Sequence, residues 1–377
     1  MTPRERMLAA YEGRKPDCVP ASAPYLFLSD ADHWAETTSL PLWKFYEWRL
    51  LEPEEHVKRY ADFRFAMPFD SFEPWPADSV QKRARISIVE EDGRHFFKDS
   101  RDGSVKPVPD SIHEAARGGH ANEEQLVFSK EDAKARITTN PAAKQIADGH
   151  MDYAKAALSV YGGTHFFVTG GLVSTFYSCS VHFGLTNMFA VLKEEPDLFH
   201  YVSSLILEQN IESIRAYAAT GGDAIYVDDA GATSDMISVR DYETFSLPYV
   251  REQVMEIRRL GKKAILIYFG GIADRADRIL SLEPDALVME ASMGGYVNDL
   301  ASVAKLAAGK TCLYGNLNPF DDVQMLSEEA LETKVKLQHA QGSIEHRFIT
   351  STGSPLTPGT PASRIRRLIE MSHALTR

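Results

Sequence analysis

Acidic side chains directly follow short apolar runs in the second half of the chain, where they are candidates for acid–base chemistry. Asp228 and Asp229 end one such run, and Glu290 ends another. Alternation along a strand should turn one of the two aspartates into the pocket and the other toward the surrounding helices or loop. If one of them is buried near Glu290, repulsion and desolvation would raise a carboxyl pKa towards the range of a general acid. We therefore predict Asp228, Asp229 and Glu290 as catalytic residues. Capping of the local backbone before Gly231 is the alternative for the aspartate pair.

Other candidates share a position at the end of a predicted strand, or an aromatic ring suited to a pocket wall. The predicted substrate-binding residues are Tyr25, Phe27, Trp34, Asp70, Tyr226, Tyr268, Phe269, Asn316 and Ser354. Gly170–Gly171 and Gly270–Gly271 also follow apolar runs, and the second pair either lets the backbone approach a ligand or makes a plain turn. Asn316 and Asn318 carry amides that either bind a ligand or cap the local backbone.

Metal and nucleophile motifs are absent from the sequence. The chain has 12 histidines and 3 cysteines, but no H-E-x-x-H, H-x-H or Cys-x-x-Cys pattern. It also has no G-x-S-x-G nucleophile elbow and no glycine-rich nucleotide loop. We therefore expect no metal site, no serine-hydrolase chemistry and no tightly bound cofactor.

An alternation of strands and helices must position these residues. Buried strands are predicted at Asp223–Asp229, Lys263–Gly271, Asp285–Ser292, Lys310–Asn318 and His346–Ser354. The helices predicted between and after them are Val239–Leu260, Arg275–Leu282, Val297–Ala308, Glu328–Gln341 and Pro361–Leu375. Because each crossover helix returns the chain to the same edge, the strands should run parallel.

Three weaker strands upstream bring the count to eight, at Val19–Leu26, Asp62–Phe69 and His165–Gly171. Eight parallel strands favour a single (β/α)8 TIM barrel over an open doubly wound sheet. The active site of such a barrel lies at the carboxyl ends of its strands, where the candidate residues stand. We expect one domain over residues 1–377.

Residues from about 75 to 140 interrupt the alternation. Ile86–Glu90 and His95–Lys98 flank Asp92–Gly93, as in a β-hairpin, and a second turn follows at Asp102–Gly103. We interpret this region as an insertion on the barrel, which is either a lid over the pocket or a solvated decoration.

Composition narrows the class of protein. The 377 residues are 44% hydrophobic and 25% charged, as in an ordinary globular protein, and the net charge is −12. An acidic chain is a poor ligand for nucleic acid, because phosphate backbones are held by clustered Lys and Arg. No apolar run is long enough to span a membrane, and Met1–Tyr11 is polar. We expect a cytoplasmic enzyme with a small-molecule substrate.

Several segments taken in order resemble the superfamily of uroporphyrinogen decarboxylase and the corrinoid-linked methyltransferases. Thr2–Gly13 with Pro16–Pro20 looks like the opening helix and first strand of that family. Gly222–Asp229 with Phe245–Tyr249 looks like a central strand and helix. The remaining matches are Ile265–Gly270, Gly315–Pro319 and Gly353–Pro361. The resemblance implies the barrel, and it suggests a homodimer.

The chain departs from both branches of that superfamily. The decarboxylase branch has an arginine-rich segment after the first strand, whereas Tyr25–Trp34 has no arginine and two aspartates. The methyltransferase branch holds zinc through His, Cys and Cys, but Ile267, Phe269 and Ser354 stand at those positions. The resemblance thus implies a family barrel with a different pocket and without the family's zinc.

Three functions remain open. The first is methyl transfer from a methylated small molecule, such as an aryl methyl ether or a methylamine, to a corrinoid carried by a partner protein. A carboxylic acid would then protonate the departing oxygen or nitrogen. The second is decarboxylation of a carboxylic acid, and the third is ligand binding without catalysis.

Overall fold

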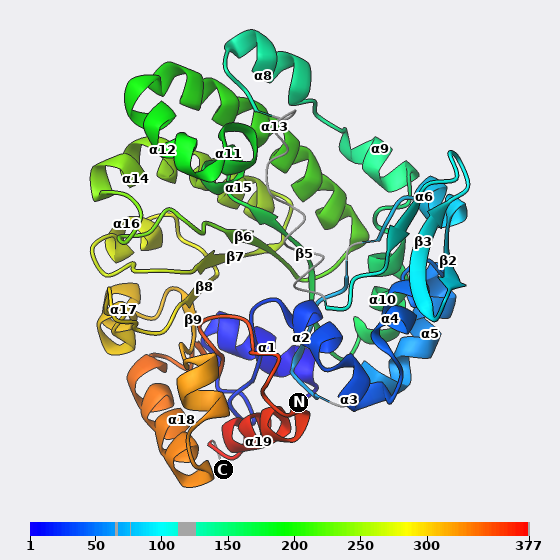
Figure 1. Ribbon diagram of the computed structural model, residues 1–377. Coiled ribbons are helices and arrows are strands. Elements are labelled where there is room, and N and C mark those ends of the chain that lie inside the picture. The colour runs from blue at the N-terminus through cyan, green and yellow to red at the C-terminus, as the bar shows by residue number, and fades with distance from the viewer. Residues whose placement is uncertain (65–66, 76, 112–125, 376–377) are drawn as a thin grey trace.

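The computed structural model describes residues 1–64, 67–75, 77–111 and 126–375, and its centre is a curled sheet of seven parallel strands (Figure 1). The strands stand in the order β1-β5-β6-β7-β8-β9-β10. Their bounds are β1 Ser71–Phe72, β5 Phe166–Val173, β6 Ala224–Asp228, β7 Lys263–Tyr268, β8 Ala286–Met289, β9 Cys312–Tyr314 and β10 Phe348–Ile349. All five strands predicted after residue 220 are confirmed, as is the strand predicted at 165–171.

A short extended segment, Pro20–Ser22, connects the two ends of this sheet. On one side, the Thr350 N–H donates to the Pro20 carbonyl at 2.9 Å, and the Ser22 N–H donates to the Thr350 carbonyl at 3.0 Å. On the other side, the Asp70 N–H donates to the Ala21 carbonyl at 3.0 Å. The segment therefore takes the place of an eighth strand, and the expected (β/α)8 architecture is confirmed as a TIM-barrel-like fold.

Two of the three upstream strands differ from the prediction. Asp62–Phe69 was predicted extended, but α5, Pro53–Arg64, runs into it, and residues 65–66 lie outside the described part. Proline at the first position and two glutamates in the first turn start this helix. The predicted strand Val19–Leu26 is reduced to a bridge at Ala21, and its last residue, Leu26, is the first residue of α2.

Helices cover the outside of the sheet. They are α10 Asp152–Tyr161, α11 Thr175–Phe183, α12 Leu185–Glu194, α13 Pro196–Thr220, α14 Val239–Phe245, α15 Leu247–Arg259, α16 Ala276–Leu280, α17 Leu300–Ala307, the π-helix η2 Pro319–Gln324, α18 Glu328–Gly342 and α19 Ala362–His373. The helix predicted at Val239–Leu260 is two helices. Pro248 cannot donate a helical hydrogen bond, so the chain breaks at Ser246 and restarts at α15.

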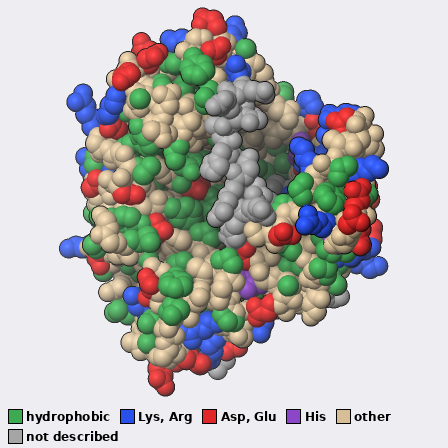
Figure 2. Space-filling view, in the orientation of Figure 1, with side chains coloured by type: hydrophobic (Ala, Val, Ile, Leu, Met, Phe, Trp, Pro, Cys, Tyr) green, Lys and Arg blue, Asp and Glu red, His purple; other side chains and the backbone are tan. Residues whose placement is uncertain are grey.

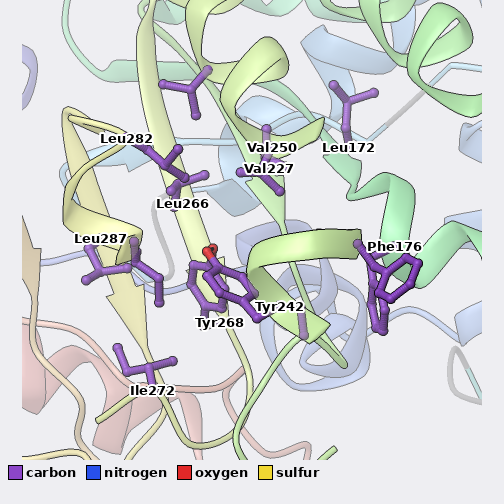
Figure 3. Packing of buried hydrophobic residues seen from close by; sticks show 14 of the residues in the cluster. Leu172, Phe176, Val227, Tyr242, Val250, Leu266, Tyr268, Ile272, Leu282 and Leu287 are labelled. Atoms are coloured by element: carbon purple, nitrogen blue, oxygen red, sulfur yellow. The ribbon is translucent and has the colours of Figure 1, made fainter. Parts of the chain in front are cut away.

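Strand residues alternate between two cores. Val227 and Leu266 point outward and pack under the helices with Tyr242 and Val250 (Figure 3). Ala224, Tyr226 and the other inward residues fill the barrel. Burial of both faces explains why these strands read as continuous apolar runs.

Helix α1, Pro3–Glu12, closes the amino end of the barrel. Its Met7, Ala10 and Tyr11 are buried in the same cluster as the inward strand residues, and the hydroxyls of Tyr11 and Tyr314 lie 3.0 Å apart. Arg4 forms an ion pair with Asp223 at 2.6 Å, directly before β6. These contacts fill the amino end of the barrel interior.

A side lobe, made of residues 26–64 and 80–107, stands beside the barrel (Figure 1). Its helices are α2 Leu26–Asp32, α3 Trp34–Thr38, α4 Leu42–Trp48, α5 Pro53–Arg64 and α6 Val80–Arg85, and its antiparallel strands are β2 Ile86–Glu91, β3 Arg94–Asp99 and β4 Val105–Pro107. The predicted hairpin is confirmed, and β4 adds a third strand. The chain then continues through α8 Lys130–Arg136 and α9 Ala142–Ala147, while 112–125 lie outside the described residues.

The glycine at 171 makes room for an inward aromatic ring. A Cβ atom there would come within 1.8 Å of the Tyr226 ring, whereas one at Gly163 would have no atom within 4 Å. We therefore expect Gly171→Ala to lower the free energy of unfolding by about 1–3 kcal/mol. Gly163→Ala, the control, should change it by no more than about 0.5 kcal/mol. Urea unfolding of both variants measures the difference, and equal stabilities would contradict this packing.

Candidate active site

The alternation of β6 separates the two adjacent aspartates, as predicted. Ala224 and Tyr226 point into the barrel, and Asp228 continues that series. Asp229 continues the outward series of Ile225 and Val227. The two carboxylates therefore lie on opposite sides of the barrel wall, and only Asp228 faces the open end.

Asp228 is a buried acid at the open end, with 5% of its surface exposed. The Tyr25 hydroxyl donates to one carboxylate oxygen, and the Ala230 N–H donates to the other at 2.9 Å. Burial raises the pKa of Asp228 to about 6, although these two hydrogen bonds oppose the shift. The charge of Asp229 adds to the rise, so the repelling carboxylate is Asp229 rather than the expected Glu290.

Asp229 is a fully buried link between the barrel wall and the helices. The Ser246 hydroxyl lies 2.8 Å from both of its carboxylate oxygens, at the break between α14 and α15. Ser174 and Tyr268 also hydrogen-bond to it, and burial raises its pKa to about 6. The structure thus places this predicted catalytic residue in the helix layer, where its bonds join β6 to three other segments.

Three residues predicted to bind substrate lie away from the open end. Tyr268 points outward, and its hydroxyl lies 3.0 Å from the Tyr242 hydroxyl (Figure 3). Trp34 packs against Phe45 inside the side lobe. Asp70 precedes β1 and pairs with Arg6 of α1, so it stands at the closed end. The prediction placed Asp70 after a strand, and the actual strand begins one residue later.

Glu290 and Ser354, which follow β8 and β10, come together beyond the carboxyl ends of these strands. The Ser354 hydroxyl donates to Glu290 Oε1 at 2.5 Å, and the Tyr296 hydroxyl donates to Oε2 at 2.5 Å. Asn316 is nearby, with its amide donating to the Asn298 carbonyl at 3.0 Å. Because the Gln338 amide also donates to Asn316 Oδ1, the Asn316 side chain is held within the protein.

Turn chemistry accounts for the other glycine and asparagine candidates. A Cβ at Gly271 would come within 2.1 Å of Ser234 Oγ, so this glycine lets the loops after β6 and β7 pack together. Asn318 Oδ1 accepts from the N–H groups of Phe320 and Asp321 at 2.9 Å each. It is the cap of η2, which is the local alternative left open by the sequence.

Four of the predicted aromatic residues pack together as a wall around Tyr25, and two of them, Phe27 and Tyr226, line a cavity. The Tyr25 ring lies 5.6 Å from Phe27, 5.4 Å from Tyr226 and 5.9 Å from Phe269, measured between centroids. Phe27 extends the wall to Trp75, at 4.6 Å. Tyr25 adopts a left-handed backbone with φ of 55°, which directs its hydroxyl towards Asp228.

Glu73, directly after β1, is a site residue that the sequence did not reveal. It is 6% exposed and lines a cavity of about 570 Å³ together with Phe27, Trp75 and Tyr226. The Leu26 N–H donates to its Oε2 at 2.9 Å, and the Tyr226 hydroxyl also bonds to it. Burial raises the pKa of Glu73 to about 8. An acid directly after Ser71–Phe72 was the available signal, but the strand was predicted to end too early.

The cavity beside Glu73 is aromatic and amide-lined. It opens where β5 continues past the end of β1, so Thr169, Gly170 and Gly171 line it. Among the described residues that line it, none is Lys or Arg, and Asn210 and His150 are among its polar groups. Glu73 is thus a carboxylic acid that stays largely protonated at neutral pH, in a cavity of a size that holds small molecules.

The described residues do not form a metal centre. No three His, Cys, Asp or Glu side chains among them come close enough to hold a metal ion. Ile267 is buried in the barrel interior and Phe269 packs beside it. Ser354 binds Glu290. The side chains at the family's zinc positions therefore do not fit that metal.

A parallel barrel with buried acids at the carboxyl ends of its strands defines a TIM-barrel-like α/β protein. A family model described as uroporphyrinogen decarboxylase (URO-D) matches residues 118–375, more than half of the chain. The chain belongs to the uroporphyrinogen decarboxylase family.

Curated relatives match over part of their length. Uroporphyrinogen decarboxylase of Chlorobium luteolum is 25% identical over 207 residues, which are 53% of this chain and 57% of that protein. The chloroplastic uroporphyrinogen decarboxylase of Zea mays is 22% identical over 213 residues, 54% of this chain and 51% of that protein. The chain therefore matches little more than half the length of these relatives.

A solved structure matches almost the whole chain. A methyltransferase from Methanosarcina mazei has a TM-score of 0.69 at 15% identity, and the match covers 99% of this chain and 98% of that one. This likeness supports the fold. Within the described ranges, no helix has the length and apolar character that crossing a membrane requires.

The buried Glu73 should make the stability of the protein depend on pH. Its pKa is about 8 in the folded state and about 4.5 when exposed, so only the folded protein holds this proton between those values. The free energy of unfolding should therefore fall as the pH rises through this range, by up to about 1.4 kcal/mol per pH unit. Glu73→Gln should show a shallower fall in urea unfolding at pH 5, 6.5 and 8.

The exposed Glu252 on α15 provides a matched control. Glu252→Gln should keep the wild-type dependence on pH. A Glu73→Gln variant with the wild-type slope would mean that Glu73 ionises normally in the folded protein.

Proposed function

We propose that this protein transfers a methyl group from a small methylated molecule, an aryl methyl ether or a methylamine, to a corrinoid carried by a partner protein. The observation that carries the proposal is Glu73, a carboxyl group with a pKa of about 8 inside a cavity with aromatic walls. Such an acid is protonated when it meets the substrate at neutral pH. The corrinoid acceptor follows from the family resemblance, and the assay below tests it.

The proton on Glu73 would stabilise the leaving group of this reaction. When the bond between methyl carbon and oxygen breaks, the electron pair stays on the oxygen, which is a poor leaving group as an anion. Transfer of the Glu73 proton to that oxygen gives a neutral product while the methyl group passes to the acceptor. A positioned acid of this kind contributes about 10²- to 10⁴-fold in rate.

Asp228 has a supporting role in this proposal. Its pKa of about 6 leaves it mostly ionised at neutral pH, with the Tyr25 hydroxyl donating to it. Tyr25 packs against Phe27 and Tyr226, and these two rings line the cavity. The hydrogen bond therefore fixes the ring that supports the aromatic lining, against which a flat substrate would pack. Burial and the nearby carboxylate raise the pKa of Tyr25, which keeps it in its donor form.

Decarboxylation is the second candidate, because the matched relatives are named as uroporphyrinogen decarboxylases. A porphyrinogen with many carboxylates would find no Lys or Arg among the described residues that line the cavity. The segment Tyr25–Trp34, where the family resemblance implies arginines in a decarboxylase, has Asp30 and Asp32 and no arginine. A smaller carboxylic acid is therefore the substrate class that this candidate requires.

One assay separates the two candidates. The protein is incubated with reduced cobalamin and a panel of methyl-labelled aryl methyl ethers and methylamines, and labelled methylcobalamin and demethylated product are measured. A panel of small carboxylic acids is assayed in parallel for release of carbon dioxide. Methyl transfer supports the proposal, whereas carbon dioxide release without methyl transfer selects decarboxylation. Tight binding with neither product would select a non-catalytic barrel.

Amide variants test the role of the acids in that assay. With the best substrate, Glu73→Gln should lower kcat by about 10²-fold or more, because the proton donor is lost. Asp228→Asn should cause a smaller loss, and Glu252→Gln should keep wild-type activity. Wild-type activity should fall above about pH 8 as Glu73 ionises, and this alkaline limb should be missing from the residual activity of Glu73→Gln. Full activity in Glu73→Gln would refute its role as the acid.

A further inference from the structure

A second cavity lies in the side lobe and shares no lining residue with the one beside Glu73. It has a volume of about 640 Å³, and its lining residues lie on or next to α4, α6 and the β2–β3–β4 sheet. The elements α4, α6, β2 and β3 lie on the same side of the molecule (Figure 1). This volume is within the range of small-molecule sites. Neither the sequence motifs nor the family match accounts for it, since the family model begins only at residue 118.

Positive charge gathers in this cavity although the protein as a whole is acidic. Its basic lining residues are Arg49, Lys82, Arg85, Arg101 and Lys106. Its acidic lining residues are Asp78, Asp99 and Asp102. Five cations against three carboxylates leave an excess of two positive charges, in a chain whose net charge is −12.

The ion pairs leave donor capacity for a further anion. Arg85 and Arg101 share a single carboxylate oxygen of Asp99, at 3.2 and 3.8 Å. Arg101 also pairs with Asp102 at 3.3 Å. Lys106 on β4 is exposed and forms no ion pair with a described residue. An arginine has five N–H donors, so each of these guanidiniums can bind an oxyanion while keeping its aspartate.

The remaining wall of the cavity is apolar. Tyr46 and Phe97 meet edge to face at 5.8 Å, and Leu50 and Ile86 lie beside them. An inorganic ion alone would leave this wall without a contact. A ligand that fills the cavity therefore combines an anionic group with an apolar or aromatic part.

We propose that this cavity binds an organic phosphate monoester, with its phosphate held by Arg85, Arg101 and Lys106. A phosphate monoester carries a charge of about −1.5 to −2 at pH 7, which matches the excess of two positive charges. Its three terminal oxygens suit forked guanidinium donors. The apolar part of the ligand packs against Tyr46 and Phe97. The site does not depend on the proposed methyl transfer.

Trp75 offers a direct optical probe of this site. The Arg49 guanidinium lines the second cavity and lies 4.9 Å from the centroid of the Trp75 ring. Trp75 in turn lines the cavity beside Glu73 and packs on Phe27. Trp34 and Trp48 belong to one buried cluster of the side lobe, and the other two tryptophans of the chain, Trp43 and Trp75, pack against it. A ligand that fills the cavity lined by Arg49 should therefore change the intrinsic fluorescence.

The experiment titrates the whole protein with phenyl phosphate, phenol and inorganic phosphate at pH 7.5 and constant ionic strength, followed by fluorescence and calorimetry. Phenyl phosphate should bind at least tenfold more tightly than phenol or inorganic phosphate. Lys106→Glu and Arg101→Glu should each weaken it at least tenfold. Both residues are exposed, so the variants should fold, and circular dichroism verifies this.

Lys305→Glu on α17 makes the same charge change on an exposed residue outside the cavity, and it should keep wild-type affinity. If Lys305→Glu and Lys106→Glu weakened phenyl phosphate binding equally, the overall charge of the protein would explain the effect, and the proposal would be overturned. Absence of saturable phenyl phosphate binding would also overturn it. Weakened binding in Glu73→Gln would place the ligand in the other cavity instead.

Discussion

Closure of the parallel sheet at one end is the constraint on which the rest of the structure depends. The Pro20–Ser22 segment joins β10 to β1, and α1 fills the amino end with Met7, Ala10 and Tyr11. Side chains that follow the strands can then meet only at the opposite end. The candidate site is therefore a consequence of barrel closure, although its residues come from segments as far apart as Tyr25 and Ser354.

Burial, more than any motif, gives these residues their chemistry. Glu73 and Asp228 are ordinary carboxylates in the sequence, and desolvation raises their pKa values to about 8 and about 6. The difference of about two pH units keeps one protonated and the other mostly ionised at neutral pH. A pair of acids with separate protonation states can divide proton donation and positioning between them.

The names of the matched proteins and the residues that line the cavities do not indicate the same substrate. Relatives that match half of the chain are named as decarboxylases, and the fold extends over the full length of a methyltransferase. The described lining of the cavity beside Glu73 has no cations, whereas the cavity in the side lobe has five. The basic side chains that line these two cavities are therefore in the side lobe and not beside Glu73.

The sequence by itself determined the parallel alternation after residue 220, the hairpin and the outward turn of one aspartate. Each depends on local periodicity or turn chemistry, as at Asp92–Gly93. Glu73, the closed-end position of Asp70 and the outward Tyr268 were decided only by tertiary structure. A two-residue strand has too little pattern to fix its register, and a shift by one residue sends a side chain to the other face. The pKa values likewise depend on long-range burial, which spacing along the chain does not reveal.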